Sequence, residues 1–341
     1  MGDKSAIQWT DATWNPTTGC DRVSPGCAHC YALDLAARLQ KMGVAGYERD
    51  GDPRTSGPGF GLTLHPDRLG IPLAWTRPRR IFVDSMSDLF HADVPDGFLM
   101  AVWKTMHDAP WHTFQVLTKR PERMAEWVAR WVDVEGETND PDRDRDPAAV
   151  RIAHPSGRGQ LFADMLTQMG PPPAGFTYPR FAWLRYADGA LPNVWLGTSV
   201  ENARFKSRIE SLRWTPAAVR FLSCEPLLGP LGELDLDGIS WVIAGGESGS
   251  AHRPLDLGWV REIRDQCVEA GVAFFFKQVG GRTPKSGGRE LDGRTWDEFP
   301  APTERPASPS PAGQRAAFGR RRQWGGLAAM SRLAHASEAG R

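Results

Sequence analysis

Short apolar runs alternate along the chain with segments that have helical spacing. The strand-like runs occupy residues 62–64, 80–83, 113–117, 194–196, 219–222, 239–244 and 272–276, with a weaker run at 12–14. Apolar side chains share single helical faces within residues 35–42, 98–106, 124–131, 205–212 and 257–267. This alternation predicts parallel βαβ units. About eight such strands suffice for a TIM-like (β/α) barrel, complete or partial. An open doubly wound sheet is the alternative, because the pattern does not show whether the sheet closes.

Polar residues gather just past the C-terminal end of nearly every predicted strand. Barrel enzymes build their sites from the loops at that end. The residues in these positions are Ser85, Asp88, Lys119, Arg120, Glu201, Asn202, Cys224, Glu225 and Glu247. One polar residue in such a place is an ordinary helix cap. A succession of them predicts a binding site at the mouth of a barrel.

Two segments interrupt the alternation. Residues 133–190 hold an acidic Asp-Pro-rich stretch and three consecutive prolines, which predicts an irregular insert. Residues 301–341 are rich in Pro, Ala, Gly and Arg, which predicts a flexible basic tail. We therefore expect one (β/α) barrel domain over residues 1–300, broken by the insert and followed by the tail.

The composition narrows the classes of function. The chain carries 41 basic and 41 acidic side chains, so its net charge gives no support for nucleic-acid binding. No apolar run approaches the ~20 residues that a membrane-spanning helix needs. Residues 1–15 lack the pattern of a secretory signal. We expect a cytoplasmic protein without membrane contact, in which five cysteines indicate metal or redox chemistry rather than disulfides.

Three of those cysteines, Cys20, Cys27 and Cys30, fall within eleven consecutive positions. Thiolates are ligands that suit iron–sulfur clusters, zinc and copper(I). Gly19 and Gly26 each precede a cysteine, where a permissive backbone lets the loop wrap closely round a metal centre.

The number of thiols leaves three interpretations open. Structural zinc sites and all-cysteine clusters take four protein ligands, whereas this loop supplies three. Either His29, Cys224 or Cys267 completes the set, or one iron of a cluster is left open, or the thiols act without a metal. An open iron is what S-adenosylmethionine needs for chelation.

The three-cysteine loop resembles the cluster loop of the radical S-adenosylmethionine superfamily. Its Asn-Pro-x-x-Gly-Cys approach over residues 15–20 and its Cys-x-His-Cys-Tyr-Ala exit over residues 27–32 are similar to enzymes related to spore photoproduct lyase. The chain resembles more closely a phage- and prophage-associated family of uncharacterised proteins with this motif. The segments that carry this resemblance are 9–32, 80–91, 117–121, 196–202, 223–227 and 245–249, within residues 5–282.

Two features depart from the superfamily pattern. The usual spacing between the cysteines is three and then two residues, whereas this loop has six and then two. A Gly-Gly-Glu near the second strand often holds the cofactor's amino group in the superfamily. Here that tripeptide, residues 245–247, follows the seventh predicted strand, so its role is not transferred.

The resemblance implies that Cys20, Cys27 and Cys30 ligate three irons of a [4Fe–4S] cluster and that the fourth iron binds S-adenosylmethionine. One electron would then cleave the sulfonium to a 5′-deoxyadenosyl radical, which abstracts hydrogen from an unknown substrate. The lyase-like loop suggests nucleic acid or a nucleotide. A flavodoxin- or ferredoxin-type electron donor and a companion protein are the expected partners.

The remaining strand-end residues become candidate contacts to the cofactor or substrate. They are Ser85, Asp88, Lys119, Glu201, Asn202, Glu225 and Glu247. Cys224 is a candidate thiol hydrogen donor, or else a small buried hydrophobe. The competing function is a non-catalytic barrel that binds zinc or a fully ligated cluster and acts with a protein partner.

Overall fold

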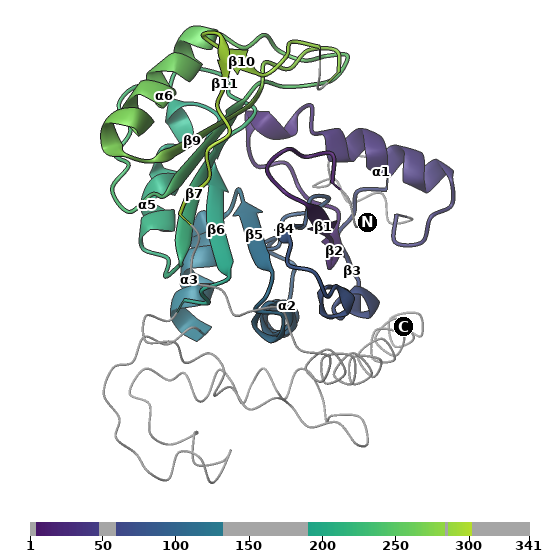
Figure 1. Cartoon of the computed structure of the whole chain (residues 1–341). Coiled ribbons are helices and arrows are strands. Elements are labelled where there is room, and N and C mark those ends of the chain that lie inside the picture. The colour runs from purple at the N-terminus through teal and green to yellow at the C-terminus, as the bar shows by residue number, and fades with distance from the viewer. Residues whose placement is uncertain (1–4, 48–58, 132–189, 284–285, 302–341) are drawn as a thin grey trace, which may run out of the picture.

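The computed structural model describes residues 5–47, 59–131, 190–283 and 286–301 (Figure 1). Its main sheet has seven parallel strands, whose order is β1 (Ala12–Trp14), β4 (Arg80–Val83), β5 (Thr113–Thr118), β6 (Val194–Ser199), β7 (Val219–Cys224), β8 (Trp241–Gly245) and β9 (Ala273–Gln278). Every neighbouring pair in the sheet is parallel. This spatial order follows the chain, as in a barrel, whereas a doubly wound sheet reverses direction at a switch point. Because β1 and β9 lie at opposite edges, the fold is a partial TIM-like barrel, which confirms the predicted class.

The two faces of this sheet carry different side chains. Residues such as Val83, Val116 and Leu222 pack in a large cluster that includes helix residues. The opposite face carries an inner aromatic cluster, in which a single non-strand residue, Trp9, joins strand residues. Its members are Trp9, Phe82, Trp195, Val219, Phe221, Trp241, Ile243 and Phe275. The helices therefore cover the outer face, and aromatic rings fill part of the inner face.

Four helices cover the outer face with the apolar residues that the spacing predicts. They are α2 (Asp96–Asp108), α3 (Pro121–Trp131), α5 (Ser207–Arg213) and α6 (Leu257–Ala270). Val102, Ile209 and Val260 are among their fully or almost fully buried residues. Helix α6 begins at the cap Asp256, whose side chain accepts from Gly258 N, and ends at Gly271 with φ of 67°. Both ends follow ordinary capping rules.

The helix after the cysteines, α1 (Tyr31–Lys41), buries a face that matches the predicted one only in part. Ala32 and Ala36 are its buried residues, whereas Leu35 and Met42 are 39% and 74% exposed. Small side chains let α1 approach the loop at Tyr47 and Phe60 closely. Of the three apolar residues that share a helical face within residues 35–42, Leu39 packs against this cluster whereas Leu35 and Met42 do not, so the predicted face is buried only in part.

One predicted strand lies outside the main sheet. Residues 63–64 form β3 (Thr63–Leu64), which pairs antiparallel with β2 (Thr17–Thr18). Pro66 follows at once and has no N–H to extend the ladder. The sheet therefore has seven strands where about eight were expected.

The remaining elements are short. They are β10 (Glu290–Leu291), β11 (Arg294–Thr295) and the 3-10 turns at Pro25–Cys27, Pro66–Arg68, Pro72–Ala74 and Ala203–Phe205. The predicted tail over 301–341 and insert over 133–190 lie outside the described residues, except for their boundary residues 301 and 190. Among the described helices, none has the length and hydropathy of a membrane span.

Candidate functional site

The cysteine loop leaves β1 at the carboxyl end of the sheet and is held by backbone contacts. Gly19 N donates to Met86 O at 2.9 Å, and Cys20 N donates to Phe60 O at 3.1 Å. Gly19 has φ of 88°, and a Cβ at this position would lie 2.1 Å from Gly61 O. Only glycine fits such a positive φ and such a close approach without strain. The backbone therefore fixes where Cys20 starts the loop.

The other two thiols, Cys27 and Cys30, lie where the loop passes through a short 3-10 turn into helix α1. Cys27 ends the 3-10 turn Pro25–Cys27, where its N–H donates to Ser24 O at 2.9 Å. Cys30 is the N-cap residue of α1. Cys20 and Cys30 pack against the same small apolar cluster, and the charge of Cys27 raises the pKa of both. The three predicted metal ligands therefore share one region at the mouth of the barrel.

Burial and nearby cations act on these thiols in opposite directions. Burial raises the pKa of Cys20 to about 12, and it also raises the pKa of Cys30. The guanidinium of Arg120 and the ammonium of Lys119 lower the pKa of Cys20 and Cys30, respectively, but do not offset burial. Cys20 and Cys30 therefore stay protonated until a metal ion or cluster supplies further positive charge.

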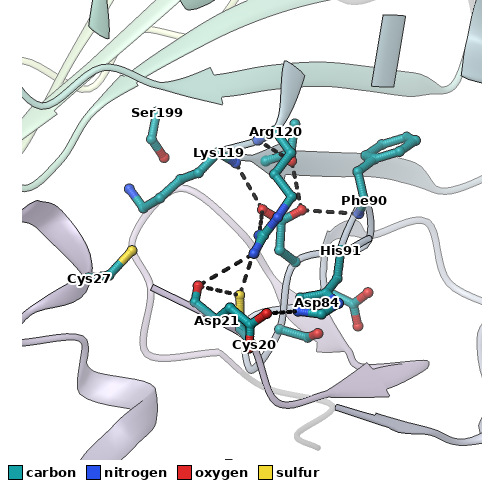
Figure 2. A network of polar contacts seen from close by, with 12 residues as sticks. Cys20, Asp21, Cys27, Asp84, Phe90, His91, Lys119, Arg120 and Ser199 are labelled. Atoms are coloured by element: carbon teal, nitrogen blue, oxygen red, sulfur yellow. Dashed lines mark hydrogen bonds and ion pairs between the residues drawn. The ribbon is translucent and has the colours of Figure 1, made fainter. Parts of the chain in front are cut away.

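Arg120 links Asp88 to the cysteine loop, and Figure 2 shows Arg120 pointing toward Cys20 and Asp21. Its Nη1 donates to Asp88 Oδ2 at 2.9 Å and to Cys20 Sγ at 3.5 Å. Asp88 also accepts from Phe90 N, Thr118 Oγ1 and Lys119 N at 3.0, 2.6 and 3.0 Å. Asp88 therefore holds Arg120 against the sulfur, and a cofactor contact to Asp88 would have to replace one of these four donors.

Glu201 holds the loop from β6. It is fully buried, and its Oε1 accepts from Ser24 Oγ at 2.5 Å and from Lys119 Nζ at 2.6 Å. Its Oε2 accepts from Arg208 Nη1 at 3.0 Å. Burial alone would raise the pKa of Glu201, but the charge of Lys119 and these hydrogen bonds lower it. A Cβ on Gly26 would lie 2.7 Å from Glu201 Oε1, so the loop packs directly on this carboxylate.

Glu247 holds the same loop from the end of β8. Its carboxylate accepts from Arg253 Nε and Nη2 at 2.9 and 2.5 Å, and it lies 3.0 Å from His29 Nδ1. Arg253 Nη2 also donates to Pro25 O at 3.0 Å. Against the opposing effect of burial, these hydrogen bonds lower the pKa of Glu247 to about 2. Two carboxylates from different strands therefore clamp the loop between Cys20 and Cys30.

Three further strand-end candidates, Ser85, Asn202 and Glu225, differ in their contacts. Ser85 Oγ donates to Asn15 Oδ1 at 3.1 Å, and its carbonyl accepts from Tyr31 OH. Asn202 caps the turn at Ala203–Phe205 through a 3.0 Å bond from Arg204 N. Glu225 forms an ion pair with Lys277. Ser85 thus lies beside the first turn of α1, whereas Asn202 has the ordinary role of a cap.

The remaining two cysteines lie in the core rather than beside the loop. Cys224 and Cys267 are fully buried in the outer apolar cluster, on the helix side of the sheet. Burial raises the pKa of both thiols. This position matches the interpretation of Cys224 as a small buried hydrophobe.

Sequence reasoning missed the residues that complete the two clamps. Arg208 and Arg253 follow the strand-end acids Glu201 and Glu247 by seven and six positions. A cation about two helical turns past an acid at the end of a strand is the signal that could have indicated them. Ser24 has no comparable signal, because a serine in a loop is common.

In the part of the chain that the structure describes, no group of three or more His, Cys, Asp or Glu side chains is arranged to hold a single metal ion. A mononuclear zinc site needs its donors gathered round one point, at ~2.3 Å for each sulfur. The ligands of a cluster lie further apart because each binds a different iron. The three cysteines of the described loop are therefore not gathered round one point as a zinc site requires.

The comparisons with known proteins give one family and one distant structure. The model of a family described as "Protein of unknown function (DUF5131)" matches residues 4–300. No curated protein matches. A solved structure of spore photoproduct lyase complexed with dinucleoside spore photoproduct is similar with a TM-score of 0.31 and 10% identity, over 74% of this chain and 59% of that chain. The chain thus spans less than two thirds of that lyase, and at this TM-score the match carries no argument about chemistry.

Proposed function

The chain belongs to the DUF5131 family of unknown function, and we propose that it is an iron–sulfur enzyme of the radical S-adenosylmethionine class. The observation that carries this proposal is the distribution of its cysteines. Cys20, Cys27 and Cys30 gather on one clamped loop at the mouth of a parallel partial barrel, while Cys224 and Cys267 are sequestered in the core.

Three features of the loop suit a [4Fe–4S] cluster. Its donors are thiols, which iron–sulfur clusters prefer. Arg120 and Lys119 bring positive charge to Cys20 and Cys30, which offsets the negative charge of bound thiolates. The donors are not arranged for one metal ion in the described residues. These features favour a cluster over the zinc alternative.

An open fourth iron is supported by what surrounds the other candidate ligands. Cys224 lies on the helix side of β7, whereas its neighbour Ser223 lies on the inner face. His29 Nδ1 is engaged by Glu247 at 3.0 Å. The outer core thus keeps Cys224 and Cys267 from acting as a fourth ligand, whereas the Glu247 contact fixes one nitrogen of His29 and leaves Nε2 to be tested.

A reduced cluster with an open iron would supply the electron for reductive cleavage of S-adenosylmethionine. The chain's own residues orient the loop and tune its charge. Glu201 and Glu247 fix the loop from β6 and β8, and Asp88 aims Arg120 at Cys20. An external donor of the flavodoxin or ferredoxin type would reduce the site, and the substrate would enter at the same mouth.

Electron paramagnetic resonance on the anaerobically reconstituted, dithionite-reduced full chain tests this function. We expect a [4Fe–4S]⁺ signal that shifts when S-adenosylmethionine is added. Cys27→Ala should lose the signal, and the matched control Cys267→Ala should keep it because Cys267 is a core residue. Stoichiometric zinc, or a cluster signal indifferent to the cofactor, would overturn the proposal and favour the non-catalytic metal-binding alternative.

A further inference from the structure

One layer of the inner face joins polar groups to the inner aromatic cluster. The strand register aligns Ser199 with Ser223, Ser223 with Ile243, and Ile243 with Phe275 across β6 to β9. Ile243 and Phe275 belong to the inner aromatic cluster. Ser199 and Ser223 are 3% and 2% exposed, and neither hydroxyl has a hydrogen-bond partner among the described residues. The layer therefore contains two buried hydroxyl groups without a hydrogen-bond partner among the described residues. One of them, Ser199, lies two residues before Glu201, which holds the cysteine loop.

Arg289 covers the Phe275 end of this layer. Its guanidinium carbon lies 5.2 Å from the centroid of the Phe275 ring. The residue is half-buried, and its Nε and Nη2 are shielded from solvent without a hydrogen-bond partner in the described part of the chain. Val279 N donates to Gly288 O at 2.9 Å, and Leu291 is buried, so the backbone on both sides of Arg289 is fixed.

Arginines of this protein that stack on an aromatic ring generally also pair with a carboxylate. Arg208 stacks on Phe205 and pairs with Glu201, and Arg294 stacks on Trp296 and pairs with Glu298. Further examples are Arg80 with Asp11 and Arg264 with Asp265 and Asp292. Arg289 has the stack but no acidic partner among the described residues.

An unpaired, shielded guanidinium edge favours an anionic ligand. Shielding charged donors from water without an acceptor is unfavourable, so an acceptor is expected to complete them. Nε and Nη2 are parallel donors that match carboxylate and phosphate oxygens bidentately. The inner-face cation nearby in sequence, Lys277, is already paired with Glu225. The positive charge of Arg289 is thus left for a ligand.

We propose that Arg289 Nε and Nη2 bind an oxyanionic group of the substrate, a phosphate or a carboxylate, at the Phe275 end of this layer, and that the Ser199 and Ser223 hydroxyls, three and two strands away, face other polar groups of the same substrate. The inference deepens the proposed function by giving the substrate a chemical class. Only the identification of the bound anion as part of the substrate rests on that function. Anion binding at Arg289 needs no cluster and is measured separately.

Isothermal titration calorimetry on the anaerobic full chain, with and without reconstituted cluster, tests the site with inorganic phosphate and with acetate. We expect at least one of these anions to bind, and Arg289→Gln to weaken that binding at least tenfold. Arg294→Gln is the matched control, because it also removes a stacked guanidinium, and it should leave binding unchanged. Arg289→Lys keeps the charge without the planar fork and should bind in between, which keeps the test decisive if Arg289→Gln fails to fold.

Three outcomes would overturn the proposal. The first is absence of phosphate and acetate binding to the wild-type chain. The second is an equal effect of Arg289→Gln and Arg294→Gln. The third is loss of S-adenosylmethionine binding in Arg289→Gln with phosphate and acetate binding unchanged, which would assign the fork to the cofactor's carboxylate instead. The first two outcomes do not depend on whether a cluster signal is seen, so failure there is distinct from failure of the proposed function.

Discussion

The inner face of the sheet has a lower part, the inner aromatic cluster, and an upper part at the carboxyl ends of the strands, where Glu201 and Glu247 lie. Different interactions stabilise the two parts. The lower part is aromatic: Trp241 contacts Trp195 and Phe221 with ring centroids 5.9 and 5.6 Å apart. The upper part is ionic, with Glu201 and Glu247 buried among basic residues. Aromatic burial is strongly favourable, whereas buried charges barely repay the cost of removing them from water. The contrast teaches that the lower, aromatic part stabilises the fold, whereas the upper, ionic part positions the cysteine loop.

The largest expected effect concerns the aromatic part. Trp241→Ala would empty the centre of the inner aromatic cluster and leave Glu298 O without the 2.9 Å bond from Trp241 Nε1. We expect the free energy of unfolding to fall by about 3–5 kcal/mol, measured by urea denaturation. Once refolded, the variant should still incorporate iron, because the clamps lie in the upper part. A loss below about 1 kcal/mol would contradict the assignment of stability to this cluster.

The second prediction weakens one clamp. Glu201→Gln leaves the buried Arg208 and the half-buried Lys119 without their anion, so we expect about 3 kcal/mol of lost stability and lower iron incorporation. The matched control is Glu210→Gln, which removes a 58% exposed carboxylate paired with Arg213 and should cost about 0.5 kcal/mol or less. Unfolding curves and iron analysis measure both effects. Equal iron content in wild type and Glu201→Gln would show that the clamp does not position the cysteines.

The fold could be predicted because its strands carry their own signal. Strands such as 194–196 and 219–222 are nearly continuous in apolar residues, since both faces of the sheet are covered. Residues 62–64 have a similar composition but are too short and too close to Pro66 to join the sheet. The buried face of helix α1 was predicted only in part correctly, because the small residues Ala32 and Ala36 make the close contact while larger residues stay exposed.

The candidate site could be predicted only in part. The cysteine spacing identified the loop, and strand-end position identified Glu201 and Glu247. Their long-range pairings could not be predicted, because Lys119 lies 82 positions from Glu201 and His29 lies 218 positions from Glu247. Such pairs depend on strand register and loop path, which local patterns do not encode. Arg289 was missed for the same reason.

The third prediction concerns pH and the buried carboxyl of Asp84, at the carboxyl end of β4. Burial raises the pKa of Asp84 to about 8, despite hydrogen bonds from Thr17 N and Oγ1. In the unfolded chain the pKa returns to 3.8, so between about pH 4 and pH 8 the folded state binds the extra proton. Asp84 then contributes a fall in the free energy of unfolding of up to about 1.4 kcal/mol per pH unit as pH rises through this window.

Asp84→Asn should remove this slope between pH 5 and pH 8 in urea denaturation. The matched control is Asp292→Asn, since Asp84 and Asp292 are the non-glycine residues with positive φ in the described chain, at 58° and 54°. Hydrogen bonds from Arg261 and Arg264 lower the pKa of Asp292 to about 2, so its titration lies below the tested range. An unchanged slope in Asp84→Asn would mean that Asp84 is ionised in the folded protein.

The smallest expected effect concerns the donor at the cluster loop. Arg120 Nη1 lies 3.5 Å from Cys20 Sγ, and hydrogen bonds and positive charge near the sulfurs raise the reduction potential of an iron–sulfur cluster. Arg120→Gln should therefore lower the potential, by about 60 mV if reduction becomes tenfold less favourable, in a redox titration followed by electron paramagnetic resonance. Arg38→Gln is the control, since it removes an exposed charge from α1. Equal potentials in the two variants, at equal iron content, would show that Arg120 only anchors the loop. A shift confined to Arg120→Gln would show that the ionic part of the inner face tunes the site, whereas the aromatic part only supports it.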